Sequence, residues 1–175
     1  MCIRDRVTII GTIGASVAAV SCFSTGRFVL GVILISFFAL SDLIDGAMAR
    51  LAGTSGPWGN FLDATLDRIV DGAIFGSLIA WAAINGQAWV AAAAAFALVT
   101  GQVTSYAKAR AEAVGAQANV GVAERAERTM GVLLAVLLTG LGVPFVLPAA
   151  LWLLGLLGVV TIVQRIAVVR GQLRT

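Results

Sequence analysis

The chain has 175 residues, of which 59% are hydrophobic and only 12% are charged, and it contains no histidine. A soluble domain of this length carries about a quarter of its residues as charges, so the composition excludes a soluble protein and indicates a membrane protein. At about 20 residues for each membrane-spanning helix, the chain is long enough for at most six or seven spans. The missing histidine excludes a Ser-His-Asp triad and every zinc site that contains histidine.

Long uncharged stretches alternate with short charged segments and predict six helices. Two of these stretches, 72–107 and 129–164, each have a turn signal in the middle, at 85–87 and 140–144. Each stretch is therefore predicted to form a helical hairpin. The predicted helices cover residues 7–25, 28–50, 60–84, 88–111, 127–143 and 148–170.

The expected fold is an all-α, polytopic membrane protein with six transmembrane helices. We expect residues 1–6 to be a truncated or non-native start, residues 7–170 to form one six-helix domain and residues 171–175 to form a C-terminal tail. The alanine run 91–95 indicates a helix face that allows close packing.

The positions of the basic residues predict the orientation, because short cytoplasmic loops collect Lys and Arg. With the N-terminus inside, every basic residue except Arg27 falls at a cytoplasmic helix end. Both termini are therefore predicted to be cytoplasmic, in the plasma membrane. Most acidic residues lie on the same side, so the functional site is expected at the cytoplasmic face. The net charge of +3 follows from this topology, and no nucleic-acid partner is expected.

Two pairs of aspartates form the strongest candidate site. Asp42 and Asp45 are three residues apart, and Asp63 and Asp67 are four apart, so each pair lies on one helix face. Because a short loop joins the two helices, the pairs are expected to face each other. Four converging carboxylates need cations, and oxygen ligands without His or Cys select Mg²⁺ or Mn²⁺. Two ions about 4 Å apart would form a two-metal site for phosphoryl transfer.

Residues beside the aspartates suit a phosphate-containing substrate. Gly46 allows close access to the helix backbone, the loop 53–57 is rich in backbone donors and hydroxyls, and Arg50 can bind a diphosphate through two nitrogens. The alternative is that the aspartates form structural ion pairs with nearby arginines. Arg68 and Asp71 have no assigned role in the site, and a mutual or neighbouring ion pair is expected for them.

The run from Asp42 to Asp67 resembles the signature of the CDP-alcohol phosphotransferases, which are six-helix membrane enzymes. Eight positions match without a gap: Asp42, Asp45, Gly46, Ala49, Arg50, Gly59, Asp63 and Asp67. The resemblance implies that the four aspartates bind metal and that Asp67 is also the general base. It also implies that CDP-diacylglycerol is held by Gly46, Arg50, the loop residues Ser55 and Gly56, and Thr8 of the first helix. A homodimer is expected on the same ground.

Basic residues on three further helices form a second candidate group. Lys108, Arg110, Arg128 and Arg165 could meet around one anion, for which Arg and Lys are the usual ligands; the alternative is that they only anchor the helix ends. With Ser105, Tyr106 and Glu112, this pattern resembles the actinobacterial subgroup of the family whose acceptor is inositol phosphate. In that subgroup, residues matching Ser105, Lys108, Arg110, Arg128 and a sixth-helix arginine, here Arg165, line the acceptor phosphate pocket.

The predicted function is transfer of a phosphatidyl group from CDP-diacylglycerol to inositol phosphate within membrane lipid. Glycerol 3-phosphate is an alternative acceptor, because it also carries a phosphate. A cation transporter is the alternative from another class, although it predicts acidic residues near the bilayer midplane and an internal repeat.

Overall fold

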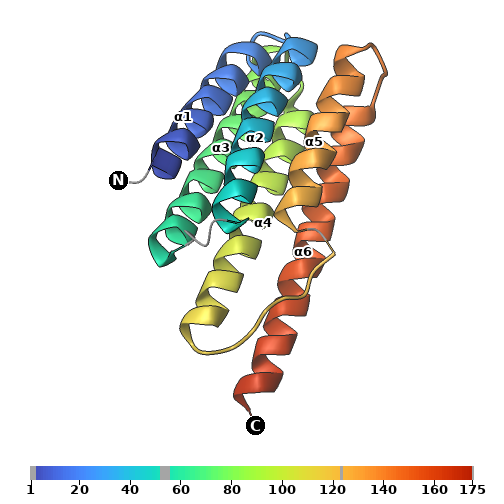
Figure 1. Cartoon of the computed structure of the whole chain (residues 1–175). Helices are drawn as coiled ribbons and strands as arrows, with labels where there is room; N and C mark the ends of the chain where they lie inside the picture. The colour runs from blue at the N-terminus through green and yellow to red at the C-terminus, as the bar shows by residue number, and fades with distance from the viewer. Residues whose placement is uncertain (1–2, 52–55, 123, 175) are drawn as a thin grey trace. The chain divides into compact units, whose positions relative to one another are not determined.

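The computed structural model describes the backbone of residues 3–51, 56–122 and 124–174, and the side chains of residues 6–40, 56–122 and 124–174 (Figure 1). Within these residues the secondary structure is entirely helical. The six α-helices are α1 (Ile3–Ala18), α2 (Phe28–Leu51), α3 (Pro57–Ile84), α4 (Ala88–Ala113), α5 (Arg125–Gly140) and α6 (Val146–Leu173), and a π-helix (Ala19–Phe23) follows α1.

The structure confirms the six predicted helices and the predicted turn within each of the two long uncharged stretches. Gly86 and Gly142 have positive φ angles of 69° and 92° in these two turns, a conformation that glycine adopts without strain. Helix ends differ by a few residues from the prediction. The first helix is also interrupted, since its C-terminal part forms the π-helical turn at Ala19–Phe23.

Three helices in the described part of the chain are long and apolar enough to cross a membrane, namely Arg6–Phe23, Ala88–Ala113 and Val146–Leu173. Among the others, α5 has only 16 residues, or about 24 Å at 1.5 Å per residue. That length is less than the roughly 30 Å of bilayer hydrocarbon. The charged residues 63, 67, 68 and 71 in the first half of α3 reduce its apolar length.

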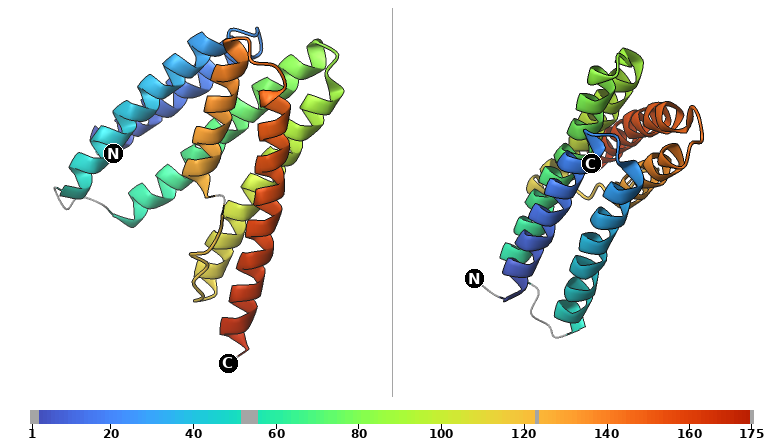
Figure 2. Two further views of the ribbon diagram at one scale, coloured as in Figure 1. Left: turned by 90° about the vertical axis from the view of Figure 1, so that its right-hand side faces the viewer. Right: turned by 90° about the horizontal axis from the view of Figure 1, so that it is seen from above.

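The chain divides into two compact units, residues 1–81 and 82–175. In the first unit, α1 and α2 run side by side as a hairpin (Figures 1 and 2). The ring of Phe28 at the start of α2 packs edge-on against Trp81 of α3, with 4.8 Å between ring centroids. An aromatic contact therefore joins α2 to α3 at this end of the first unit.

An ion pair on α3 confirms the expected pairing of Arg68 with Asp71. The Arg68 Nη2 and Asp71 Oδ2 atoms are 3.6 Å apart, and the Asp71 side chain is only 2% exposed. A carboxylate at such a position needs a cation nearby, because burial removes its hydration.

Replacing Arg68 with alanine is expected to destabilise the first unit by about 2–4 kcal/mol, since the buried Asp71 carboxylate would lose its cation. Arg68→Lys retains the charge and should cost less. Thermal unfolding in detergent would measure both variants. Equal stability of Arg68→Ala and Arg68→Lys would show that the pair contributes little.

In the second unit, α4 and α6 pack side by side, and α5 packs on α6 (Figures 1 and 2). Small residues permit the close approach of α4 and α6. Ala93, Ala94 and Ala97 are fully buried, and the Thr104 hydroxyl reaches the carbonyl of Gly158 at 3.5 Å. This burial agrees with the close packing predicted for the alanine run.

Candidate active site

The first turns of α3 carry two of the four predicted aspartates. The helix begins at Pro57, a favoured residue at a first helical position because its fixed φ suits the helix. Asp63 is exposed and Asp67 is half-buried, and one helical turn separates them on the same face. Two carboxylates in this arrangement supply oxygen ligands that suit a hard divalent cation.

Of the other residues predicted for this site, the structure describes Thr8 and Gly56. The Thr8 side chain is buried on α1. Gly56 is exposed immediately before α3, and an added Cβ would meet no atom within 4 Å. Ser55 lies outside the described residues. Four further residues belong to α2 by their backbone, but lie where no side chain is described: Asp42, Asp45, Gly46 and Arg50. Among the side chains that are described, no three carboxylate or thiol groups gather as a metal site.

Arg128 is a buried basic residue of the second group. It lies in the first turn of α5 and is 3% exposed. Its guanidinium packs onto Gly101 of α4, where an added Cβ would lie only 2.7 Å from the Arg128 Cζ. Ser105, one turn further along α4, donates its hydroxyl to the Gly101 carbonyl at 3.2 Å. The structure thus places Arg128 and Ser105 at the same glycine.

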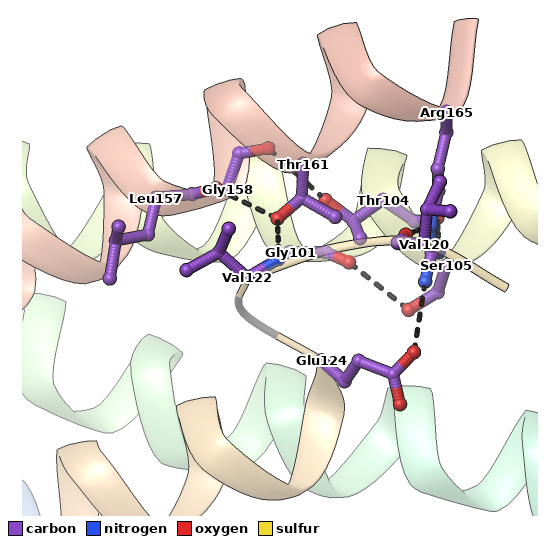
Figure 3. Close-up of polar contacts among 10 residues, drawn as sticks. All are labelled: Gly101, Thr104, Ser105, Val120, Val122, Glu124, Leu157, Gly158, Thr161 and Arg165. Atoms are coloured by element: carbon purple, nitrogen blue, oxygen red, sulfur yellow. Dashed lines mark hydrogen bonds and ion pairs between the residues drawn. The ribbon is translucent and has the colours of Figure 1, made fainter. Parts of the chain in front are cut away.

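Arg165 of α6 is also 3% exposed. Its guanidinium nitrogens contact other residues of the protein (Figure 3). Its Nε donates to the Val120 carbonyl at 2.9 Å and its Nη1 to the Thr104 carbonyl at 2.6 Å. Its Nη2 lies 3.7 Å from Glu124 Oε1. Sequence reasoning found Arg165 but missed these partners, because two of them are main-chain carbonyls that carry no residue-specific signal.

Lys108 and Arg110 lie on opposite sides of α4, because two helical positions differ by about 200° around the axis. Arg110 is exposed, whereas Lys108 is half-buried. Arg110 lines a pocket of about 420 Å³ between the C-terminal parts of α4 and α6, together with Arg165, Arg170 and apolar side chains. Ser105, Lys108 and Arg128 are not part of its lining. The structure therefore brings Arg110 together with Arg165, and Ser105 together with Arg128.

An all-helical membrane protein with carboxylate pairs and buried arginines fits a membrane transferase for phosphate-containing substrates. Residues 1–168 match the family model of the CDP-alcohol phosphatidyltransferases, and the chain belongs to this family.

Individual relatives are similar over nearly the whole chain. The phosphatidylinositol phosphate synthase of Streptomyces avermitilis is 44% identical over 96% of this chain and 72% of its own length. The enzyme of the same name from Cutibacterium acnes is 44% identical over 95% of this chain and 84% of its own length.

Crystal structures of the Mycobacterium tuberculosis phosphatidylinositol phosphate synthase have the same fold. The structure with CDP-DAG bound has a TM-score of 0.90 and 40% identity, and covers 96% of this chain and 86% of that chain. The structure in complex with manganese and citrate also has a TM-score of 0.90 and 40% identity, and covers 96% of this chain and 82% of that chain.

Proposed function

We propose that the protein transfers the phosphatidyl group of CDP-diacylglycerol to a hydroxyl of inositol phosphate, releasing CMP. The observation that carries this proposal is the sequence identity of 44% over nearly the whole chain with enzymes named phosphatidylinositol phosphate synthase. Family membership also favours a transferase over the alternative of a cation transporter. The reaction is a step of phospholipid biosynthesis.

Divalent cations are the cofactor, and the donor set fits them. Asp63 and Asp67 offer oxygen ligands from one face of α3, and the chain has no histidine to favour zinc. With Asp42 and Asp45 they would hold two Mg²⁺ ions, for which Mn²⁺ can substitute. When bound, the cations supply positive charge that stabilises the diphosphate and the leaving CMP.

The protein's own residues perform the other steps. The CDP part of the donor is bound by Gly46, Arg50, Ser55, Gly56 and Thr8. The acyl chains of the donor stay in the bilayer. Asp67 accepts the proton of the acceptor hydroxyl, whose oxygen attacks the phosphorus that bears diacylglycerol. The bond between this phosphorus and the oxygen of the CMP phosphate breaks, and CMP leaves.

The acceptor phosphate is bound by Ser105, Lys108, Arg110, Arg128 and Arg165. The burial of Arg128 supports this assignment, since a buried guanidinium is only weakly hydrated and binds phosphate strongly. An acceptor without a phosphate would make no charge-assisted contact with these residues. Glycerol 3-phosphate shares the phosphate, and the experiment below separates it from inositol phosphate.

The proposed setting is the plasma membrane, crossed by all six helices with both termini and the active site on the cytoplasmic side. The excess of Lys and Arg at one set of helix ends supports this orientation. A homodimer is proposed as the assembly.

The purified protein in lipid nanodiscs with CDP-diacylglycerol and Mg²⁺ tests the reaction and the acceptor together. We expect CMP release and a phosphatidylinositol phosphate product with inositol phosphate, and little release with free inositol. Faster turnover with glycerol 3-phosphate would overturn the acceptor assignment. Cation flux in proteoliposomes without CMP release would overturn the reaction class.

Replacing Gly101 with alanine is expected to displace the Arg128 guanidinium, because the new Cβ would come within 2.7 Å of it. The KM for the acceptor should rise about tenfold. Alanine favours a helix interior over glycine by about 1 kcal/mol, which offsets part of the cost of moving the buried guanidinium, so the thermal unfolding temperature should change little. Gly131→Ala on α5, whose Cβ would have its nearest contact at 3.4 Å, is the matched control. An unchanged acceptor KM in Gly101→Ala would argue against phosphate binding by Arg128.

A further inference from the structure

The segment that connects α4 to α5 lies along one face of α6. Four residues of α6, spaced four, four and three apart, contact it in turn: Thr161, Arg165, Val169 and Gln172. Their partners on the segment run in the opposite order along the chain, from Val122 back to Gln117. The segment is therefore held on α6 along its length, and Figure 3 shows the part of it nearest Arg165 and Thr161.

Gln172 holds its end of the segment through the main-chain atoms of Gln117. Its Oε1 accepts a hydrogen bond from the Gln117 backbone N–H, and its Nε2 donates to the Gln117 carbonyl, both at 2.8 Å. The amide side chain thus pairs with the two backbone groups of one residue, as a neighbouring strand would. The side chain of Gln117 has no part in either bond.

Thr161 holds the other end. Its hydroxyl accepts a hydrogen bond from the Val122 N–H at 3.3 Å and donates to the Leu157 carbonyl at 2.9 Å. The preceding residue, Gly121, has a φ of 154°, and an added Cβ would lie 2.5 Å from Thr161 Cγ2. Only glycine allows the backbone to approach α6 so closely.

The anchored segment ends just before the residues assigned to acceptor binding. Glu124 lies two positions after Val122 and contacts Arg165, and α5 starts at the next residue. Arg128 lies one turn later. The described residues between the two helices, up to Val122, form no helix or strand, so hydrogen bonds to α6 are what hold Gln117, Val120 and Val122 in place.

We propose that Thr161 and Gln172 are positioning residues for the acceptor site, which act by holding the α4–α5 segment against α6. This inference rests on the proposed function, because it takes Arg128 as a phosphate ligand. Loosening the segment releases the start of α5 and spreads Arg128 over several positions. Acceptor binding weakens, whereas the aspartate group on α2 and α3 keeps its sequence and structure.

The comparison of Gln172→Ala with Gln117→Ala tests the proposal. Gln172→Ala removes both hydrogen bonds, whereas Gln117→Ala removes an exposed side chain and retains them. The bonds are exposed and each contributes modestly, so we expect the KM for inositol phosphate to rise about three- to fivefold in Gln172→Ala only. The kcat and the KM for CDP-diacylglycerol should stay within about twofold of wild type. Equal acceptor KM values in the two variants would overturn the proposal.

Thr161 provides a second pair of variants. Thr161→Val retains the shape of the side chain but loses the acceptor for the Val122 N–H, whereas Thr161→Ser retains the hydroxyl. We expect Thr161→Val to raise the acceptor KM and Thr161→Ser to restore it. Failure of serine to rescue would mean that packing, rather than the hydrogen bond, is responsible.

Amide hydrogen exchange gives a readout that is independent of the acceptor's identity. Gln172→Ala should accelerate exchange in residues 116–122 relative to Gln117→Ala, and unchanged exchange would overturn the anchoring role. Faster exchange with an unchanged acceptor KM would overturn the positioning role. If wild-type protein turns over glycerol 3-phosphate instead of inositol phosphate, the proposed acceptor is wrong, and the same KM comparison is made with glycerol 3-phosphate.

Discussion

Replacing Asp67 with asparagine is expected to lower kcat by about 10²- to 10⁴-fold, the usual contribution of a general base. Asparagine has nearly the same shape as aspartate and retains one oxygen ligand, but it cannot take the proton of the acceptor hydroxyl. Asp67 is half-buried on α3, one turn after Asp63. CMP release at saturating concentrations of both substrates measures the effect.

A rise in divalent cation concentration separates the two roles assigned to Asp67. A variant impaired only in metal binding recovers its rate at high Mg²⁺, whereas a variant without its base does not. Thr65→Ala is the control on the same helix segment but on its opposite side, because the exposed Thr65 hydroxyl donates within α3, to the Phe61 carbonyl at 2.8 Å. Normal turnover of Asp67→Asn would remove the assignment of Asp67 as the base.

The helical architecture could be predicted because its signals are local. The breaks at Asn85 and Gly86 and at Gly142 interrupt uncharged stretches that are too long for one helix, and glycine is the residue that turns there with positive φ. The π-helical turn at Ala19–Phe23 could not be predicted, since the sequence around it continues the apolar pattern of a regular helix.

The sequence predicted the charge and the helix of each arginine, but not its hydrogen-bond partners. Sequence spacing identified Arg165 as a cation on the sixth helix, but its main partners are the carbonyls of Thr104 and Val120. Such contacts depend on the path of the chain between α4 and α5. The three glutamine and threonine bonds along that segment were missed for the same reason.

The grouping of Lys108 with Arg110 shows a second feature that charge and sequence position alone do not predict. Both residues are basic and close in sequence, so charge alone places them together. Helical geometry turns them to opposite sides of α4, and the pocket between α4 and α6 takes in Arg110 and Arg165 without Lys108. Shared binding of one phosphate by Lys108 and Arg110 stays a prediction, and separate KM measurements on Lys108→Gln and Arg110→Gln would test it.

Removing divalent cations with a chelator is expected to abolish CMP release completely, and added Mg²⁺ or Mn²⁺ should restore it. The donor carries a negatively charged diphosphate, and the proposed site consists of four carboxylates. Without cations these charges repel at close range, so binding of CDP-diacylglycerol should be lost together with the chemical step.

Asp63→Asn provides the matching variant, because it removes one carboxylate from the exposed first turns of α3 without changing the size of the side chain. The Mg²⁺ concentration for half-maximal activity should rise at least about tenfold, since even residues that only support a metal ligand have effects of that size. Because saturating Mg²⁺ refills the weakened site, kcat should recover much further than in Asp67→Asn. Turnover that persists in the chelated protein, or an unchanged Mg²⁺ requirement in Asp63→Asn, would contradict the carboxylate site.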